Sequence, residues 1–135
     1  MLQRTLAADD DAGSAAAANQ VVAAYQAIDR ERGTLPVSVA RLWNDHARAL
    51  RPALDKLARA ANLETRRVPF QPLSDTLWAM IQDFDPAVER PLRLFHCPMA
   101  FDNTGADWIQ QDPQIANPYF GDMMLRCGSE VSIHE

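Results

Sequence analysis

Two sulfur-bearing stretches near the C-terminus contain the residue types best suited to chemistry. They are HCPM at residues 96–99 and MMLRC at residues 123–127. In an extended chain, Cys97 and Met99 face the same side, and the histidine between Phe95 and Cys97 faces the other. On a helical turn, the two methionines, three and four residues before Cys127, can share its face. Thiolate and thioether donors together favour Cu(I), and by extension Ag(I), whereas zinc makes little use of methionine.

The sequence leaves three interpretations of these sulfur atoms open. The first is a soft-metal site, which would bind as thiolates and weaken as the pH falls. The second is a Cys97–Cys127 disulfide, which would close a loop of about 30 residues and stabilise the fold by about 3–4 kcal/mol in the chain-entropy model. In the third, the methionines simply fill gaps in the core.

Other chemistries find little support. His46 lies on an apolar stripe beside Trp43, which favours a hydrogen-bonded core histidine over a ligand. Asp102, Asp107 and Asp112 are five residues apart and lack the close alternation and the glutamate of a calcium loop. No isolated carboxylate pair and no base tied to either cysteine suggests catalysis, and the five glycines form no phosphate loop. We therefore predict that the chain is not an enzyme.

Composition and charge exclude further classes of function. The chain has 135 residues and a net charge of -5, so one domain over residues 1–135 is expected and nucleic-acid binding is not. Residues 92–135 hold two arginines against six acids, 2 − 6 = −4, so most of the negative charge lies in the tail and suits a cation. No apolar run is long enough to span a membrane, and the first ten residues are too polar for a signal peptide.

Helices must position these residues. Apolar residues recur with helical spacing in three long segments, at 12–31, 36–62 and 70–84. The acids at 9–11 suit the N-cap of the first, and Gly33 suits its C-cap. The proline-bearing residues 68–72 are expected to form a link before the third helix. Residues 1–85 are thus predicted to form an antiparallel up-and-down helical bundle.

The tail, residues 92–135, has a different character. Its prolines and glycines predict a loop-rich segment, with short strands only at 92–95 and 131–133. Aromatic and apolar side chains should pack it on the bundle. These are Phe95, Phe101, Trp108, Ile109, Tyr119 and Phe120. The predicted fold class is therefore mainly α, with a loop-rich C-terminal segment of short strands or turns.

The tail resembles a bacterial domain family of unknown function. The shared pattern is Cys-Pro-Met, then Gly-Ala-x-Trp, then Asn-Pro-Tyr-Phe-Gly-x-x-Met-Leu-x-Cys-Gly, here at residues 97–99, 105–108 and 117–128. The helical segments at 43–60 and 72–84 are similar too. Members of this family often form the C-terminal part of periplasmic adaptor (membrane-fusion) subunits of copper and silver efflux pumps, or occur as exported proteins.

The resemblance implies both a ligand set and a setting. Its motif makes Cys97, Met99, Met124 and Cys127 the soft ligands of Cu(I) or Ag(I), and leaves Met123 outside. Expected partners are the metal ion and an efflux-pump adaptor or metallochaperone, and the expected location is periplasmic or exported. Members usually have a longer first helix and an export signal or a preceding adaptor, so we expect this chain to be an excised piece of a longer protein.

Overall fold

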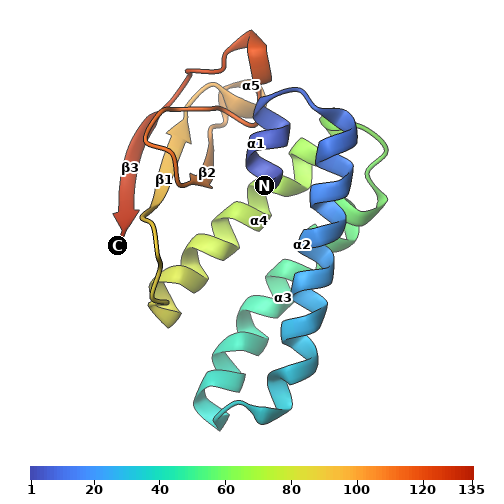
Figure 1. Ribbon diagram of the computed structural model, residues 1–135, viewed down its shortest axis with the longest axis vertical. Coiled ribbons are helices and arrows are strands. Elements are labelled where there is room, and N and C mark those ends of the chain that lie inside the picture. The colour runs from blue at the N-terminus through green and yellow to red at the C-terminus, as the bar shows by residue number, and fades with distance from the viewer.

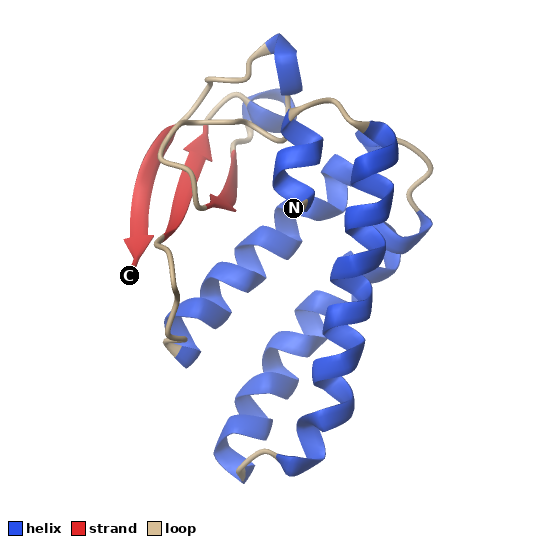
Figure 2. Ribbon diagram, in the orientation of Figure 1, coloured by secondary structure: helices blue, strands red, loops and turns tan.

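The computed structural model describes residues 1–135. In it, helices pack beside a small sheet (Figures 1 and 2). The elements in chain order are α1 (Leu2–Ala7), α2 (Asp11–Glu31), the 3-10 turn η1 (Arg32–Thr34), α3 (Val37–Arg59), α4 (Leu63–Phe84), β1 (Leu92–Cys97), α5 (Ala100–Asn103), β2 (Ala106–Gln110), the 3-10 turn η2 (Gly121–Met123) and β3 (Ser129–His134). None of these helices combines the length and the apolar character that crossing a bilayer requires.

The three long helices follow one another in opposite directions. In Figure 1, α2 runs along most of the long axis of the molecule, α3 returns beside it, and α4 runs back from the far end of α3. Their packing buries the stripe of α3, which includes Trp43, Leu50, Leu54 and Leu57. The predicted fold class, a mainly α bundle with a C-terminal segment of short strands, is confirmed.

Side-chain caps explain where the helices begin. The Asp10 carboxylate accepts a hydrogen bond from the Gly13 backbone at 2.9 Å and starts α2, as the sequence predicts. Asn62 and Thr65 form a reciprocal capping box that starts α4 at Leu63. The predicted link at residues 68–72 is therefore wrong, because the capped helix continues through it and Pro69 is buried within.

The expected C-cap at Gly33 is also wrong. This glycine lies inside η1, and its φ is outside the left-handed range that a glycine cap adopts. The chain instead leaves α2 through a 3-10 turn, which closes with a hydrogen bond from the Leu35 backbone to the Arg32 carbonyl.

The sheet has the order β2-β1-β3, and both pairs are antiparallel. The two predicted strands are present and longer than expected. The third strand, β2, is not predicted by the sequence pattern. Its side chains alternate, with Ala106, Trp108 and Gln110 buried. This is the period of a half-buried strand. The flanking Gly105 and Asp112–Pro113 made the same residues look like part of a loop.

An aromatic cluster joins the sheet to the bundle. Trp108 and Phe95 pair across β2 and β1, and their rings stack with centroids 5.5 Å apart. Tyr119 meets Trp108 edge to face at 6.1 Å, and Phe70 of α4 at 5.9 Å. All four side chains are buried in the same core as the bundle. The prediction that aromatic side chains pack the tail on the helices is confirmed for Phe95, Trp108 and Tyr119, and Phe101 and Phe120 pack partly buried against the same core. The sixth predicted residue, Ile109, is not part of this core, because it alternates with the buried positions of β2.

Polar contacts reinforce this junction at the turn between α1 and α2. The Arg67 guanidinium of α4 donates to the Leu6 carbonyl at 2.8 Å, the Asp9 carboxylate at 2.5 Å and the Pro118 carbonyl of the tail at 2.8 Å. The Asp122 backbone also donates to Asp9, at 2.9 Å. That hydrogen bond and then the Arg67 contact lower the pKa of Asp9 from its ordinary value of 3.8.

Replacing Asp9 with asparagine tests this contact. Asp9 has a φ of +54°, a conformation that asparagine tolerates, so the turn should survive. Because the folded pKa is lowered, the charged form stabilises the protein above its ordinary pKa, and this stability is lost as the pH falls through the folded value. Urea denaturation should show D9N less stable by about 0.5–1 kcal/mol at pH 7. The difference should shrink as the pH falls below 3.8 and vanish once Asp9 is protonated in both the folded and the unfolded state. A difference that persists there would contradict the role of the charge.

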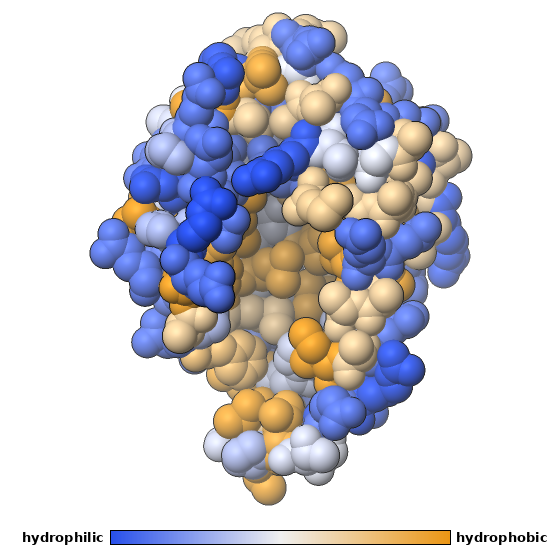
Figure 3. Space-filling model, in the orientation of Figure 1, coloured by the Kyte–Doolittle hydropathy of each residue, from blue (hydrophilic) through white to orange (hydrophobic).

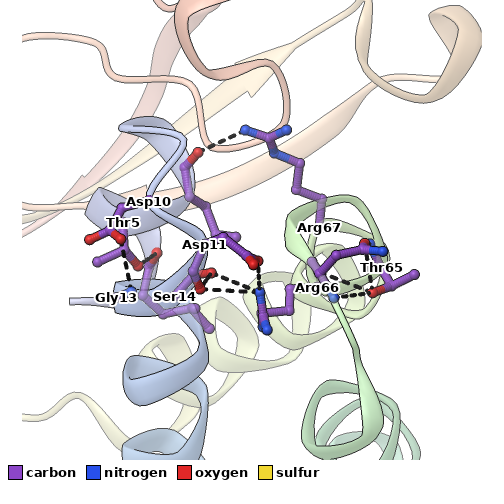
Figure 4. Close-up of polar contacts among 11 residues, drawn as sticks. Thr5, Asp10, Asp11, Gly13, Ser14, Thr65, Arg66 and Arg67 are labelled. Carbon is purple, nitrogen blue, oxygen red and sulfur yellow. Dashed lines mark hydrogen bonds and ion pairs between the residues drawn. The ribbon is translucent and has the colours of Figure 1, made fainter.

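A second ion pair ties α4 to the start of α2 (Figure 4). The side chain of Arg66 is only 6% exposed, and it donates to the Asp11 carboxylate and, at 3.1 Å, to the Ser14 hydroxyl. Charged hydrogen bonds of this kind contribute more than neutral ones.

Arg66→Met should lower the free energy of unfolding by about 2 kcal/mol, because methionine keeps the packing of the side chain but loses these bonds. Arg59→Met is the matched control. The Arg59 side chain is exposed and makes no hydrogen bond or ion pair, so its loss should cost less than about 0.5 kcal/mol. Equal losses for both variants, measured by urea denaturation, would show that the contact contributes nothing specific.

Candidate functional site

The fold brings the two cysteines together. Cys97 ends β1 and is fully buried, and Cys127 lies in the irregular segment just before β3 and is partly exposed. Their Sγ atoms are 2.9 Å apart, and both are free thiols. Residues 30 positions apart in the sequence thus form a single sulfur pair at one end of the sheet.

Backbone contacts fix the position of Cys127. Asn117 is fully buried, and its side-chain amide donates to the Cys127 carbonyl at 2.8 Å. The same side chain accepts from the Tyr119 backbone at 2.8 Å, and the Asn117 backbone donates to the Leu125 carbonyl at 2.8 Å. Because these hydrogen bonds fix the buried Asn117 amide, they also fix the backbone of Cys127. No local pattern around Asn117 predicts these contacts, because its partners lie up to ten residues away.

Gly128 sets how closely this segment approaches the sheet. Its φ is +134°, and a Cβ there would lie 2.8 Å from both the His96 carbonyl oxygen and Cη2 of Trp108. Only glycine tolerates both the conformation and the contact. This close approach holds Cys127 against the end of β1.

The methionines are placed differently from the prediction. The extended geometry that put Cys97 and Met99 on one face is wrong, because β1 ends at Cys97 and the chain turns at Pro98–Met99. Met99 is 46% exposed. Met124 is not in a helical turn either. Its φ of −146° and ψ of 52° are non-helical, and its carbonyl accepts from the Cys127 backbone at 3.0 Å.

The pair has a distinct electrostatic setting. The hydrogen-bonding contact with Cys97 and then partial burial raise the pKa of Cys127, and the Met99 backbone opposes them. Tyr119 lies in the same core as Cys97. Burial and then the charge of Asp75 raise the pKa of Tyr119 far above its ordinary value of 10.0. Tyr119 is therefore a neutral hydroxyl that donates to the Asp107 carbonyl. Cys97 itself is fully buried in the hydrophobic core.

The histidines contribute no further ligand. His96 faces away from the sulfurs, as predicted, and its Nδ1 lies 2.6 Å from the Asp107 carboxylate on the outer side of the sheet. His46 is a hydrogen-bonded histidine, with Nε2 2.7 Å from the Asp83 carboxylate. No three His, Cys, Asp or Glu side chains converge as a metal-holding group. A closed zinc cage is therefore not built here, since structural zinc sites use four such ligands.

A separate apolar groove lies between α2, α3 and α4, where Figure 3 shows hydrophobic side chains deep in a hollow of the surface. It has a volume of about 220 Å³, and all ten residues that line it are hydrophobic. They include Tyr25 and Trp43, whose rings stack 5.9 Å apart. No charged residue, cysteine or histidine lines the groove, and its one thioether, that of Met80, has no thiolate beside it.

Comparison with known proteins identifies the family. A family profile described as a protein of unknown function (DUF3347) matches residues 1–89. The chain belongs to this family. The DUF3347 match spans α1 to α4 and stops before β1, so the Cys-Pro-Met pattern and the sulfur pair lie outside it. No curated protein and no solved structure matches the chain. Membership of a family of unknown function is thereby confirmed, whereas the tail pattern on which the resemblance was based lies outside the matched residues.

Gly128→Ala tests the close approach at Cys127. The new methyl group would meet the His96 carbonyl oxygen and Trp108 in a strained backbone, so it should cost about 2 kcal/mol or more in thermal or urea denaturation. Gly33→Ala is the matched control, because a Cβ there meets nothing within 4 Å. It should be neutral or stabilise by about 0.5 kcal/mol. If the two variants behaved alike, the tight contact at Gly128 would be refuted.

Proposed function

We propose that this chain is a soft-metal binding module, with Cys97 and Cys127 as the central ligands of Cu(I) or Ag(I) and Met99 and Met124 as thioether donors at its edge. The observation that carries the proposal is the 2.9 Å separation of the two sulfur atoms. Thiolates and thioethers select Cu(I) over harder cations. The proposal is for a binding module and not for an enzyme.

The spacing of the sulfurs is compatible with one shared ion after a small adjustment. At a metal–sulfur distance of about 2.3 Å, two thiolates in tetrahedral geometry stand about 3.8 Å apart. The Sγ atoms would need to separate by about 1 Å from their present 2.9 Å. Cys127 lies outside the regular strands, so rotation of its side chain can supply this movement without breaking the ladder of β1.

The partial exposure of the proposed ligands suits a module that transfers its metal ion rather than one that stores it. Cys97 is sealed in the core, whereas Cys127 is partly exposed and Met99 is 46% exposed. A metal held there would remain accessible to an incoming thiol or thioether from another protein. The tail's charge of −4 also attracts a cation more than an anion. Transfer to an efflux-pump adaptor or metallochaperone outside the cytoplasm is the setting that the family resemblance suggests for this module.

A second candidate function is favoured by the same distance. A disulfide requires the sulfurs to approach to about 2.05 Å, a movement of about 0.9 Å. The chain would then be a structural or protein-interaction module whose tail is pinned by a Cys97–Cys127 bridge. The two functions differ in the oxidation state of the same pair, so one preparation can separate them.

The test is a Cu(I) titration of protein purified without oxygen, in competition with a chromogenic chelator. Two free thiols should be counted first, and the protein should then withdraw one equivalent of Cu(I). The double variant Cys97→Ser/Cys127→Ser should withdraw none. Met99→Ala should weaken binding by about tenfold, as expected for loss of a supporting donor.

Met123→Ala is the matched control, because Met123 is 81% exposed and lies outside the motif. Its affinity should equal that of the unaltered protein. Absence of Cu(I) binding with both thiols free would refute the metal function. Two thiols that are already bridged in protein purified under native conditions would favour the pinned structural module.

A further inference from the structure

We propose that Cys97 and Cys127 also undergo reversible thiol–disulfide exchange with low-molecular-weight disulfides, with Cys127 reacting first, and that this exchange switches the sulfur site between an open and a closed state. The exchange rests only on the geometry of the reduced pair. Its consequence for metal rests on the proposed function, and the two can be measured separately.

The reduced pair is already arranged for the second step of exchange. Sulfur atoms 2.9 Å apart need to move by about 0.9 Å to reach bonding distance. The backbones that carry them are held in place, Cys97 by its ladder pairing with Ala106 and Cys127 by the Asn117 amide. Neither loop closure nor a rearrangement of the sheet stands between the thiols and a disulfide.

The two sulfurs differ in access, which sets the order of events. Cys97 has no exposed surface, since it faces the core that contains Phe95 and Trp108. Cys127 is partly exposed beside the half-exposed Met99. Thiol–disulfide exchange needs an in-line approach of a bulky disulfide to the attacking sulfur. Only Cys127 offers that approach, so Cys97 can react only with a sulfur that Cys127 brings to it.

The chemistry balances in two steps. The Cys127 thiolate attacks one sulfur of an external disulfide RSSR, forms a mixed disulfide and releases one thiolate RS⁻. Cys97 then attacks the Cys127 sulfur, forms the Cys97–Cys127 bond and releases the second RS⁻. The two cysteine protons end on the two released thiols, giving two RSH. The cysteines lose two electrons, and RSSR, which is the oxidant, gains them.

The product differs from the reduced pair in ways that matter for the site. Both thiolates are consumed in one bond, so the two strongest soft donors are lost together. The bond also joins the end of β1 to the start of β3 and closes residues 97 to 127 into a loop. Since Cys127 adjoins Gly128, which touches Trp108, the closed state fixes the tail against the aromatic cluster.

The experiment treats fully reduced, metal-free protein with oxidised glutathione and measures thiols by alkylation and intact mass. The unaltered protein should lose two thiols together and retain no glutathione, and reduced glutathione in excess should restore both. Cys97→Ser should trap one glutathione on Cys127. Cys127→Ser should be modified roughly tenfold more slowly or not at all, because its remaining thiol is buried.

Three results would overturn the exchange: both thiols persisting in excess oxidised glutathione, a mixed disulfide accumulating on the unaltered protein, or Cys127→Ser being modified as fast as Cys97→Ser. Circular dichroism identifies a variant that has lost its fold. Cys127→Ala and Cys97→Ala then provide the same comparison, and the reversibility of the unaltered protein needs no variant.

The consequence for metal is measured on the same samples. The oxidised protein should withdraw no Cu(I) from the chelator, and reduction should restore one equivalent. If the reduced protein binds no Cu(I) while the thiols still exchange, the proposed function fails and the exchange stands. If Cu(I) binds but the thiols never pair, the exchange fails and the metal function stands. Cu(I) binding that survives complete oxidation would refute the switch.

Discussion

The burial of Trp108 is the constraint on which the sulfur pair depends. Its ring has no exposed surface, stacks on Phe95 of β1, and meets Tyr119 edge to face. Its Nε1 donates to the Gln110 side chain at 2.7 Å, so the one polar atom of the ring is satisfied. The edge of the ring lies where a side chain on Gly128 would be. A single aromatic side chain therefore determines how β1 meets β2 and how closely the Cys127 segment can approach Cys97.

The helices give this small sheet a core that it could not build alone. A three-stranded sheet with short strands buries little surface without a partner. Here Phe70 of α4 and the residues of α1 complete the cluster, and Arg67 holds the α1–α2 turn and the tail to the same helix. Loss of packing on α4 would thus change the position of the cysteines, although no α4 residue forms a hydrogen bond with either sulfur atom. This interface physically connects the helices that the family profile matches with the tail that carries the two cysteines.

Sequence patterns predicted the parts of the fold that are set locally. The apolar period of residues 36–62 and the acids before residue 12 specified two helices, because spacing and capping act over a few residues. The same local rules failed at Pro69 and Pro72, where the Asn62 cap and tertiary burial outweigh the helix-breaking tendency of proline. At the sulfur pair, the residue types alone drew attention to the cysteines and methionines, and their role stays a prediction. Their geometry could not be predicted, because it depends on Asn117 and Gly128, whose partners come from distant segments.

The arrangement of the sulfurs makes the two proposed states, a metal-bound pair and a disulfide, mutually exclusive. At 2.9 Å the pair lies between the separation in a disulfide, about 2.05 Å, and that of two thiolates on one ion, about 3.8 Å. Each state requires a displacement of about 1 Å, in opposite directions, and the rotation of one side chain at Cys127 can provide either. Cys97 cannot adjust in the same way, since β1 and the aromatic cluster enclose it. In both proposed states the buried Cys97 sulfur would stay in place, and the partly exposed Cys127 sulfur would be the one that moves.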